Sequence, residues 1–131
     1  MVDDIFDAIN FEELVVQAKA YSYGDLLAQF RRNGKMKIDV LCGLAVITPT
    51  QYHKYRNNED VPKRDTLKRI ILALRLSVSE AQRLWACSGY YASTLEDLVF
   101  FKCIELGEYD IDSINNYLFA RSLNAIEIPE D

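Results

Sequence analysis

The sequence has few residues that break helices or link domains. Its 131 residues include five glycines and three prolines, with no Gly-rich or Ser-rich stretch. A chain of this length without a linker is expected to fold as a single domain over residues 1–131, with its flanking segments packed on one core. The three cysteines, Cys42, Cys87 and Cys103, are widely spaced and odd in number. They are expected to be reduced and mostly buried, without disulfides or a zinc site.

Signals for export, membrane insertion and catalysis are also missing. No apolar run approaches the roughly 18 residues of a membrane-spanning helix, and the acidic residues 1–4 do not begin a signal peptide. There is no Walker-type loop, dinucleotide fingerprint or metal-ligand spacing, and the one histidine, His53, has no specified catalytic partner. We therefore expect a cytoplasmic protein with no membrane contact, no enzymatic activity, and no metal or cofactor.

Positive charge is scarce at both ends of the chain. The formal net charge is −5. Counting Lys and Arg against Asp and Glu gives −5 for residues 1–30, +7 for residues 31–83 and −7 for residues 84–131. A basic centre of this kind favours local attraction to a phosphate backbone, even on an acidic protein.

Helical periodicity, by contrast, is abundant, and it predicts an all-α fold. The expected helices follow Asn10 at the N-terminus and then cover about residues 23–33, 38–45, 49–57, 64–74, 78–88, 95–106 and 111 onward. Helix starts are marked by the cap residues Asn10, Thr48, Ser77 and Asp110, and helix ends by Gly34, Gly89 and Gly107. Gly34 is expected to take the left-handed conformation that ends many helices.

Residues 36–62 carry the most specific pattern. They read M-K-I-D-V-L-C-G-L-A-V-I-T-P-T-Q-Y-H-K-Y-R-N-N-E-D-V-P, which resembles the helix-turn-helix core of the lambda-repressor-like (XRE) family. The resemblance covers residues 25–76 and implies a helix-turn-helix bundle, extended here by an N-terminal helix and by a C-terminal helical hairpin over residues 77–131. The family's apolar positions fall on Leu41, Leu44, Ala45, Ile47, Tyr52 and Tyr55, its recognition-helix cap on Thr48, and its proline on Pro62.

The C-terminal stretch from residue 88 to residue 123 is similar to the tail of small uncharacterised bacterial helix-turn-helix proteins. The similarity rests on the Ser-Gly-Tyr step at residues 88–90 and on the Gly-Glu-Tyr-Asp-Ile loop at residues 107–111. It assigns no chemistry. Because this stretch is acidic, it is expected to form a homodimer contact or to bind a protein partner rather than DNA.

The resemblance implies double-stranded DNA as the partner and a sequence-specific, DNA-binding transcriptional regulator of bacterial or mobile-element origin as the function. A homodimer would then place two copies of the helix over residues 48–57 in successive major grooves. Base edges would be faced by Thr48, Thr50 and Gln51, with His53 and Lys54 one turn further on. Expected phosphate contacts are Lys37, Arg56, Lys63, Arg64 and Lys68, together with Arg31, Arg32 and Lys35.

Three departures from the family pattern favour an alternative. Ile38 replaces a phosphate-contacting glutamine, Val46 replaces the turn glycine, and Pro49 offers no donor where a base contact is common. The alternative is a protein-interaction module with the same fold, such as an antitoxin-like or phage-encoded inhibitor. The basic residues at 63, 64, 68 and 69 would then be no more than a solvated helix face.

Overall fold

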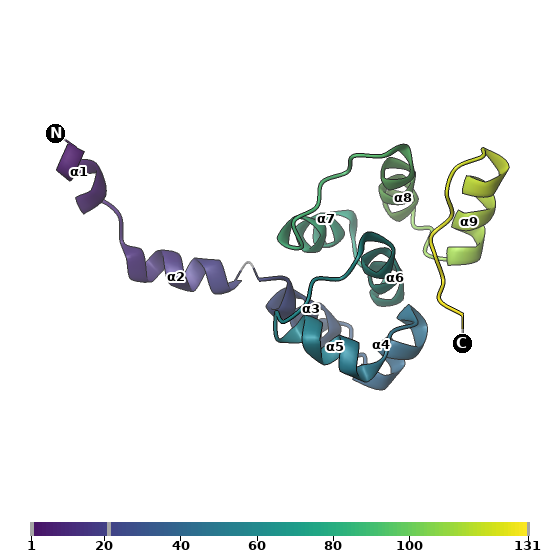
Figure 1. Cartoon of the computed structure of the whole chain (residues 1–131), viewed down its shortest axis with the longest axis horizontal. Helices are drawn as coiled ribbons and strands as arrows, with labels where there is room; N and C mark the ends of the chain where they lie inside the picture. The colour runs from purple at the N-terminus through teal and green to yellow at the C-terminus, as the bar shows by residue number, and fades with distance from the viewer. Residues whose placement is uncertain (1, 21, 131) are drawn as a thin grey trace.

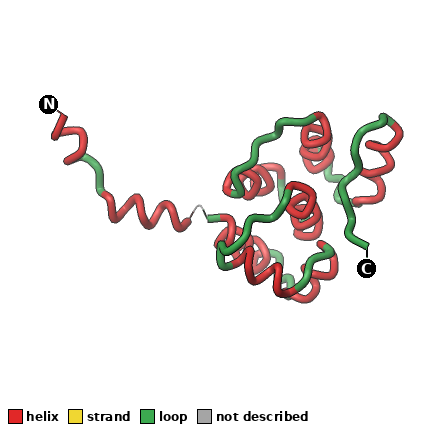
Figure 2. Tube along the Cα trace, viewed as in Figure 1, coloured by secondary structure: helices red, strands yellow, loops and turns green. Residues whose placement is uncertain are grey.

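The computed structural model describes residues 2–20 and 22–130, and within these ranges the chain forms α-helices and no β-strand. The all-α class predicted from the sequence is confirmed. The helices are α1 (Val2–Asp7), α2 (Phe11–Ala20), α3 (Tyr23–Asn33), α4 (Ile38–Ala45), α5 (Pro49–Arg56), α6 (Arg64–Leu74), α7 (Val78–Cys87), α8 (Leu95–Glu105) and α9 (Ile111–Ala120). Short loops join them (Figures 1 and 2).

The helix starts follow from local sequence. A Ser, Thr, Asn or Asp side chain at the N-cap accepts a hydrogen bond from the backbone N–H three residues further on, which satisfies one of the donors left open at a helix start. Among the described residues this device opens six helices, with Asn10, Ser22, Thr48, Ser77, Thr94 and Asp110 as the caps. The predicted starts at Asn10, Thr48, Ser77 and Asp110 are confirmed.

One predicted helix end is wrong in detail. Gly34 does not take the left-handed conformation, because its φ of −81° continues the helical geometry of α3. The left-handed residue is Lys35, with φ 54°. The turn closes when the N–H of Lys35 bonds to the carbonyl of Arg32 and the N–H of Met36 bonds to that of Arg31. The predicted stops at Gly89 and Gly107, with φ 86° and 81°, do use the left-handed region that glycine enters without strain.

Helix α6 lies at the centre of the body. Six successive residues, 67–72, are buried, so this helix is covered on every side along that stretch. It packs mainly against α4, while α3 packs against α5 and α7, and α8 packs against both α7 and α9 (Figure 1). The core therefore runs from the bundle of α3 to α6 into the C-terminal helices without a break.

The two flanking segments behave differently. The expected packing on the core is found for the C-terminal segment but not for α1 and α2, which extend away from the body (Figure 1). Every described side chain from residue 5 to residue 17 is exposed, including Phe6, Phe11 and Val16. After α9 and a turn at residues 121–122, residues 123–130 form an extended tail that returns along the body towards α4 (Figure 1).

The three cysteines are all reduced. Cys42 is buried, while Cys87 and Cys103 are half-buried. Burial raises the pKa of each thiol above its ordinary value, and neighbouring acidic groups add to this for Cys42 and Cys103. The thiol form of all three is therefore favoured at neutral pH over the reactive thiolate.

Candidate nucleic-acid interface

Helices α4 and α5 are joined by a turn of three residues. The turn begins with Val46, which takes the left-handed conformation at φ 56° and ψ 51° and donates its N–H to the carbonyl of Cys42. Ile47 is buried and anchors the turn in the core. Thr48 then caps α5, and Pro49 occupies the first helical turn, where a missing N–H costs nothing.

One face of α5 holds the helix on the body. Tyr52 and Tyr55 are buried, and the Tyr52 hydroxyl accepts a hydrogen bond from Nε of Arg31 at 2.9 Å. Arg31 also donates from Nη1 to the carbonyl of Met36 at 2.9 Å. Arg31 is therefore committed to positioning α5, and it is not free for the phosphate contact that the sequence suggested.

The opposite face of α5 is open to solvent. Thr50, Gln51, His53 and Lys54 are all exposed. The capping box uses part of this face, because Oε1 of Gln51 accepts the N–H of Thr48 at 2.8 Å and Oγ1 of Thr48 accepts the N–H of Gln51 at 3.1 Å. What remains of Gln51 for another molecule is its NH2 group, a hydrogen-bond donor.

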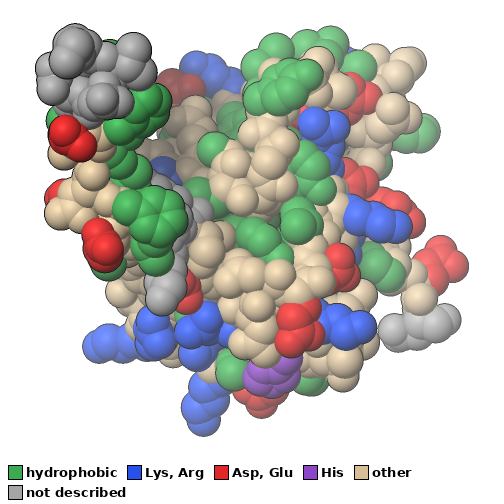
Figure 3. Space-filling model, turned by 60° about the vertical axis from the view of Figure 1, so that its left-hand side comes forward, with side chains coloured by type: hydrophobic (Ala, Val, Ile, Leu, Met, Phe, Trp, Pro, Cys, Tyr) green, Lys and Arg blue, Asp and Glu red, His purple; other side chains and the backbone are tan. Residues whose placement is uncertain are grey.

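A basic rim surrounds this exposed face. Lys37 precedes α4 and Lys63 precedes α6, and both side chains are exposed. In Figure 3, Lys and Arg side chains gather at the lower edge of the molecule beside the single histidine, with Asp and Glu side chains among them. Arg56 is partly neutralised, because its Nη1 lies 3.1 Å from Oδ1 of Asp25. This pair is half-exposed and therefore weak.

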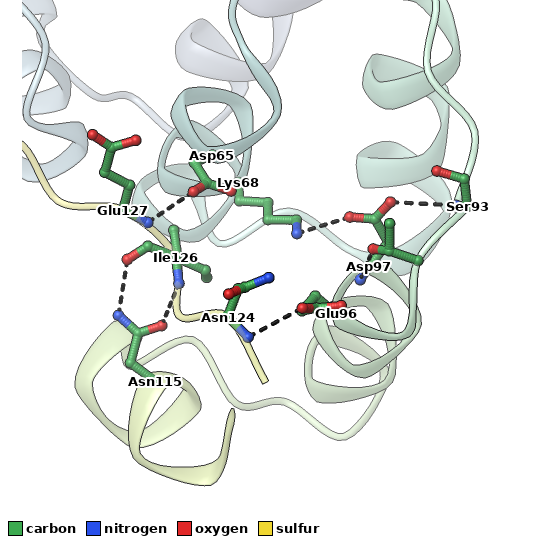
Figure 4. Close-up of polar contacts among 10 residues, drawn as sticks. Asp65, Lys68, Ser93, Glu96, Asp97, Asn115, Asn124, Ile126 and Glu127 are labelled. Carbon is green, nitrogen blue, oxygen red and sulfur yellow. Dashed lines mark hydrogen bonds and ion pairs between the residues drawn. The ribbon is translucent and has the colours of Figure 1, made fainter. Parts of the chain in front are cut away.

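The predicted phosphate contact at Lys68 is wrong. Its side chain is 5% exposed, and Nζ lies 2.8 Å from Oδ1 of Asp97, which is 2% exposed. Arg69 is buried as well, so the solvated basic face expected on α6 does not exist at these two positions. The cause is different for the two residues. Asp97 at the start of α8 pairs with Lys68 (Figure 4). Arg69 is held by the carbonyls of Ala45, at the end of α4, and Glu127, in the tail.

Arg64 also turns towards the body. Its guanidinium carbon lies 4.9 Å from the ring centroid of Tyr90, and the side chain is half-buried. Tyr90 in turn donates its hydroxyl to the carbonyl of Pro62 at 2.7 Å. Arg64 and Tyr90 thus link the start of α6 and the loop before it to the loop after α7. Of the phosphate contacts predicted at Lys63, Arg64 and Lys68, only Lys63 has an exposed side chain.

An apolar strip borders the candidate interface. The sequence placed Leu44 among the core positions, but its side chain is 59% exposed. Val40 and Val46 are exposed beside it, at 47% and 36%. Val40 and Leu44 are four residues apart on α4 and therefore lie on one face of that helix.

Sequence reasoning missed the C-terminal tail. A cavity of about 710 Å³ beside the start of α5 is lined by Thr48 and Gln51 on one side and by Glu127 and Glu130 on the other. Arg69 bridges the two, since its Nε donates to the carbonyl of Ala45 at 2.8 Å and its Nη1 to that of Glu127. The alternation of Ile126 and Ile128 with polar residues was the available signal for an extended segment.

Neither a metal site nor a membrane-spanning helix is found in the described part of the chain. Across residues 2–20 and 22–130, no three His, Cys, Asp or Glu side chains are grouped as metal ligands. In the same ranges no helix has both the length and the apolar character needed to cross a bilayer. No protein-family model, curated protein sequence or solved structure matches the chain.

Proposed function

We propose that the protein is a cytoplasmic DNA-binding regulator of transcription, and that α4 and α5 act as a helix-turn-helix of the lambda-repressor-like type. The carrying observation is the exposed face of α5, which presents Thr50, Gln51, His53 and Lys54 to solvent, together with the exposed cations Lys37 before α4 and Lys63 before α6. The Oε1 atom of Gln51 is used in the cap, so its NH2 group is the part left for a partner. A helix is about 10–12 Å across with its side chains, which fits the major groove of about 12 Å.

The polar and basic residues divide into two tasks in this proposal. Lys37, Lys54 and Lys63 neutralise phosphates and set the register without reading sequence. Thr50, His53 and the NH2 group of Gln51 meet base edges. Thr48 stays with its cap, and Lys68 has no part in binding.

The test is a binding titration of labelled double-stranded DNA at several salt concentrations. Lys37→Ala and Lys54→Ala should each weaken binding to every sequence alike and reduce the slope of log affinity against log salt by about one. Arg83→Ala is the matched control, because Arg83 is an exposed cation on α7 and should leave the slope unchanged. If the wild-type protein binds no DNA at about 50 mM salt, where phosphate attraction is strong, the proposal fails.

Base reading needs a variant that leaves the cap intact. Gln51→Ala removes the capping box together with the reading group, so its effect is mixed. Thr50→Ala leaves the cap in place and should relax the preference at one base pair, at about 1–3 kcal/mol on the preferred site. If Thr50→Ala lowers the affinity for all DNA sequences equally, Thr50 helps to position the protein on DNA and does not read a base.

A second candidate is a protein-interaction module on the same scaffold. The observation that favours it is the exposed strip of Val40, Leu44 and Val46 beside α5, which an interface would cover and DNA phosphates would not. The salt titration separates the two candidates, because only the regulator requires Lys54 for binding.

A further inference from the structure

The C-terminal tail is held as an extended peptide is held by a receptor. Oδ1 of Asn115 accepts the N–H of Ile126 at 2.7 Å, and Nδ2 of the same side chain donates to the Ile126 carbonyl at 3.1 Å. The N–H of Glu127 bonds to Oδ2 of Asp65 at 2.9 Å, and that of Asn124 bonds to Oε2 of Glu96 at 3.1 Å. Figure 4 shows these contacts converging on the tail from α6, α8 and α9.

We call this surface the tail groove and define it by Asp65, Arg69, Glu96 and Asn115. It binds main-chain groups through side chains, and it takes one aliphatic side chain, Ile126, which is 3% exposed. Main-chain recognition with a single apolar anchor does not depend on whether the peptide is joined to the same molecule. The occupant whose fit is already shown is this sequence, residues 124–127.

The connection between α9 and the tail is short and strained. It contains Ser122 at φ 58°, a left-handed conformation that costs a residue with a Cβ atom free energy. The turn is closed by hydrogen bonds from Ser122 N–H to the Phe119 carbonyl and from Leu123 N–H to the Leu118 carbonyl, both 3.0 Å. A short, strained hinge favours exchange of the segment that follows it, since opening the hinge removes the strain.

An apolar side chain also lies beside this hinge. Phe119, three residues before Ser122 at the end of α9, is 82% exposed. A second copy that approaches the hinge with its own tail can bury this side chain, which is the additional contact that exchange needs.

We propose that two copies of the chain exchange their C-terminal tails, residues 123–130, so that each tail groove binds the tail of the other copy. The exchange is symmetric and closes as a dimer. It does not require DNA binding, and so it stands or falls independently of the function proposed above.

Ser122→Pro is the decisive variant. Proline fixes φ near −65° and has no N–H, so the closed hinge cannot form. The tail then reaches only the groove of a second copy, and sedimentation velocity of the full chain should find a larger dimer fraction than the wild type shows at the same concentration. Adding Asn115→Ala, which removes both bonds to Ile126, should return this variant to monomer. Asn116→Ala, an exposed neighbour on α9, is the matched control and should leave the dimer intact.

The opposite change tests the hinge itself. Ser122→Gly relieves the left-handed strain of the closed form and should lower the dimer association constant by at least about fivefold. A folded but monomeric Ser122→Pro variant overturns the proposal. If that variant loses its helical circular dichroism, the glycine variant decides, because equal dimerisation of glycine variant and wild type overturns the proposal as well.

Discussion

The ion pair between Lys68 and Asp97 joins α6 to the start of α8. Both side chains are almost wholly buried, and Lys68 Nζ also lies 5.6 Å from the ring centroid of Phe100 and 5.9 Å from that of Trp85. Burial by itself raises the pKa of Asp97, but the hydrogen bond and charge of Lys68, with the N–H of Ser93, outweigh it and hold that pKa below its ordinary value. The carboxylate is therefore ionised in the folded protein at neutral pH.

Breaking this pair should be costly. Lys68→Ala leaves a buried, unpaired carboxylate and is expected to lower the free energy of unfolding by about 3–5 kcal/mol in urea titrations. Lys63→Ala, the exposed control, should change it by no more than about 0.5 kcal/mol. The double variant Lys68→Met/Asp97→Leu should recover most of the loss, since well-packed apolar residues can replace a buried pair. A loss in Lys68→Ala no larger than in the control would contradict the buried position.

The same pair sets a pH dependence. Because the pKa of Asp97 is lower in the folded state than in the unfolded chain, its contribution to stability is complete above the unfolded value of about 3.9. It is lost as the pH falls through the folded value. Asp97→Asn cannot ionise, so the stability gap between wild type and this variant should be widest at neutral pH and narrow below about pH 4. If the difference in free energy of unfolding between wild type and Asp97→Asn does not change with pH, the charge of Asp97 does not contribute to stability.

Val46 stores strain in the turn between α4 and α5. A β-branched residue at φ 56° is expected to cost about 1–2 kcal/mol, and its side chain is too exposed for burial to offset this. Val46→Gly should therefore raise the free energy of unfolding by about 1 kcal/mol, after the entropy that glycine adds to the unfolded chain. Val61→Gly makes the same change at an exposed residue without positive φ and should instead destabilise by about 0.5–1 kcal/mol. If Val46→Gly and Val61→Gly change the free energy of unfolding equally, the backbone at Val46 is not strained.

At the scale of the elements, helix boundaries were predictable because they are set by neighbours in sequence. The predicted helices over residues 23–33, 38–45 and 64–74 match α3, α4 and α6. Caps such as Thr48 and Ser77 act within three residues, so a local pattern contains the whole cause. The burial of the apolar residues of α6 was predictable too, because their helical spacing places them on one face of the helix.

The environment of the remaining α6 residues was not predictable in this way. Periodicity shows which face of a helix is apolar, but it does not show how many neighbours surround the helix. Lys68 and Arg69 look like solvent-facing cations until α8 and the tail cover them. Leu44 is the converse case, since its spacing fits a core position while no neighbouring helix covers it. The exposure of the candidate residues was therefore predicted well on α5, where it follows from two buried tyrosines, and poorly on α6.

At the scale of the whole molecule, part of the basic charge in the centre of the sequence is neutralised or hydrogen-bonded by the acidic C-terminal part within the fold. Two of the basic residues of the centre, Lys68 and Arg69, contact the acidic C-terminal part through Asp97 and the carbonyl of Glu127. Of the basic residues of the centre, Lys37, Lys54 and Lys63 remain exposed on α5 or directly before the helices α4 and α6. The tail residues Glu127 and Glu130 line the same cavity as Thr48 and Gln51 at the start of α5, so the tail and the candidate interface share one cavity.

The N-terminal helices provide the last prediction. Because no described side chain of residues 5–17 is buried, deleting residues 1–21 should change the free energy of unfolding by no more than about 0.5 kcal/mol in urea titrations. Helices of 6 and 10 residues are marginal on their own, so α1 and α2 contribute little to cooperative unfolding. Removing exposed side chains such as Phe6 and Phe11 should also raise solubility. Phe30→Ala, a buried position on α3, is the contrasting control and should cost about 3–5 kcal/mol. A loss of about 2 kcal/mol or more on deletion would mean that α1 and α2 pack on the body in solution.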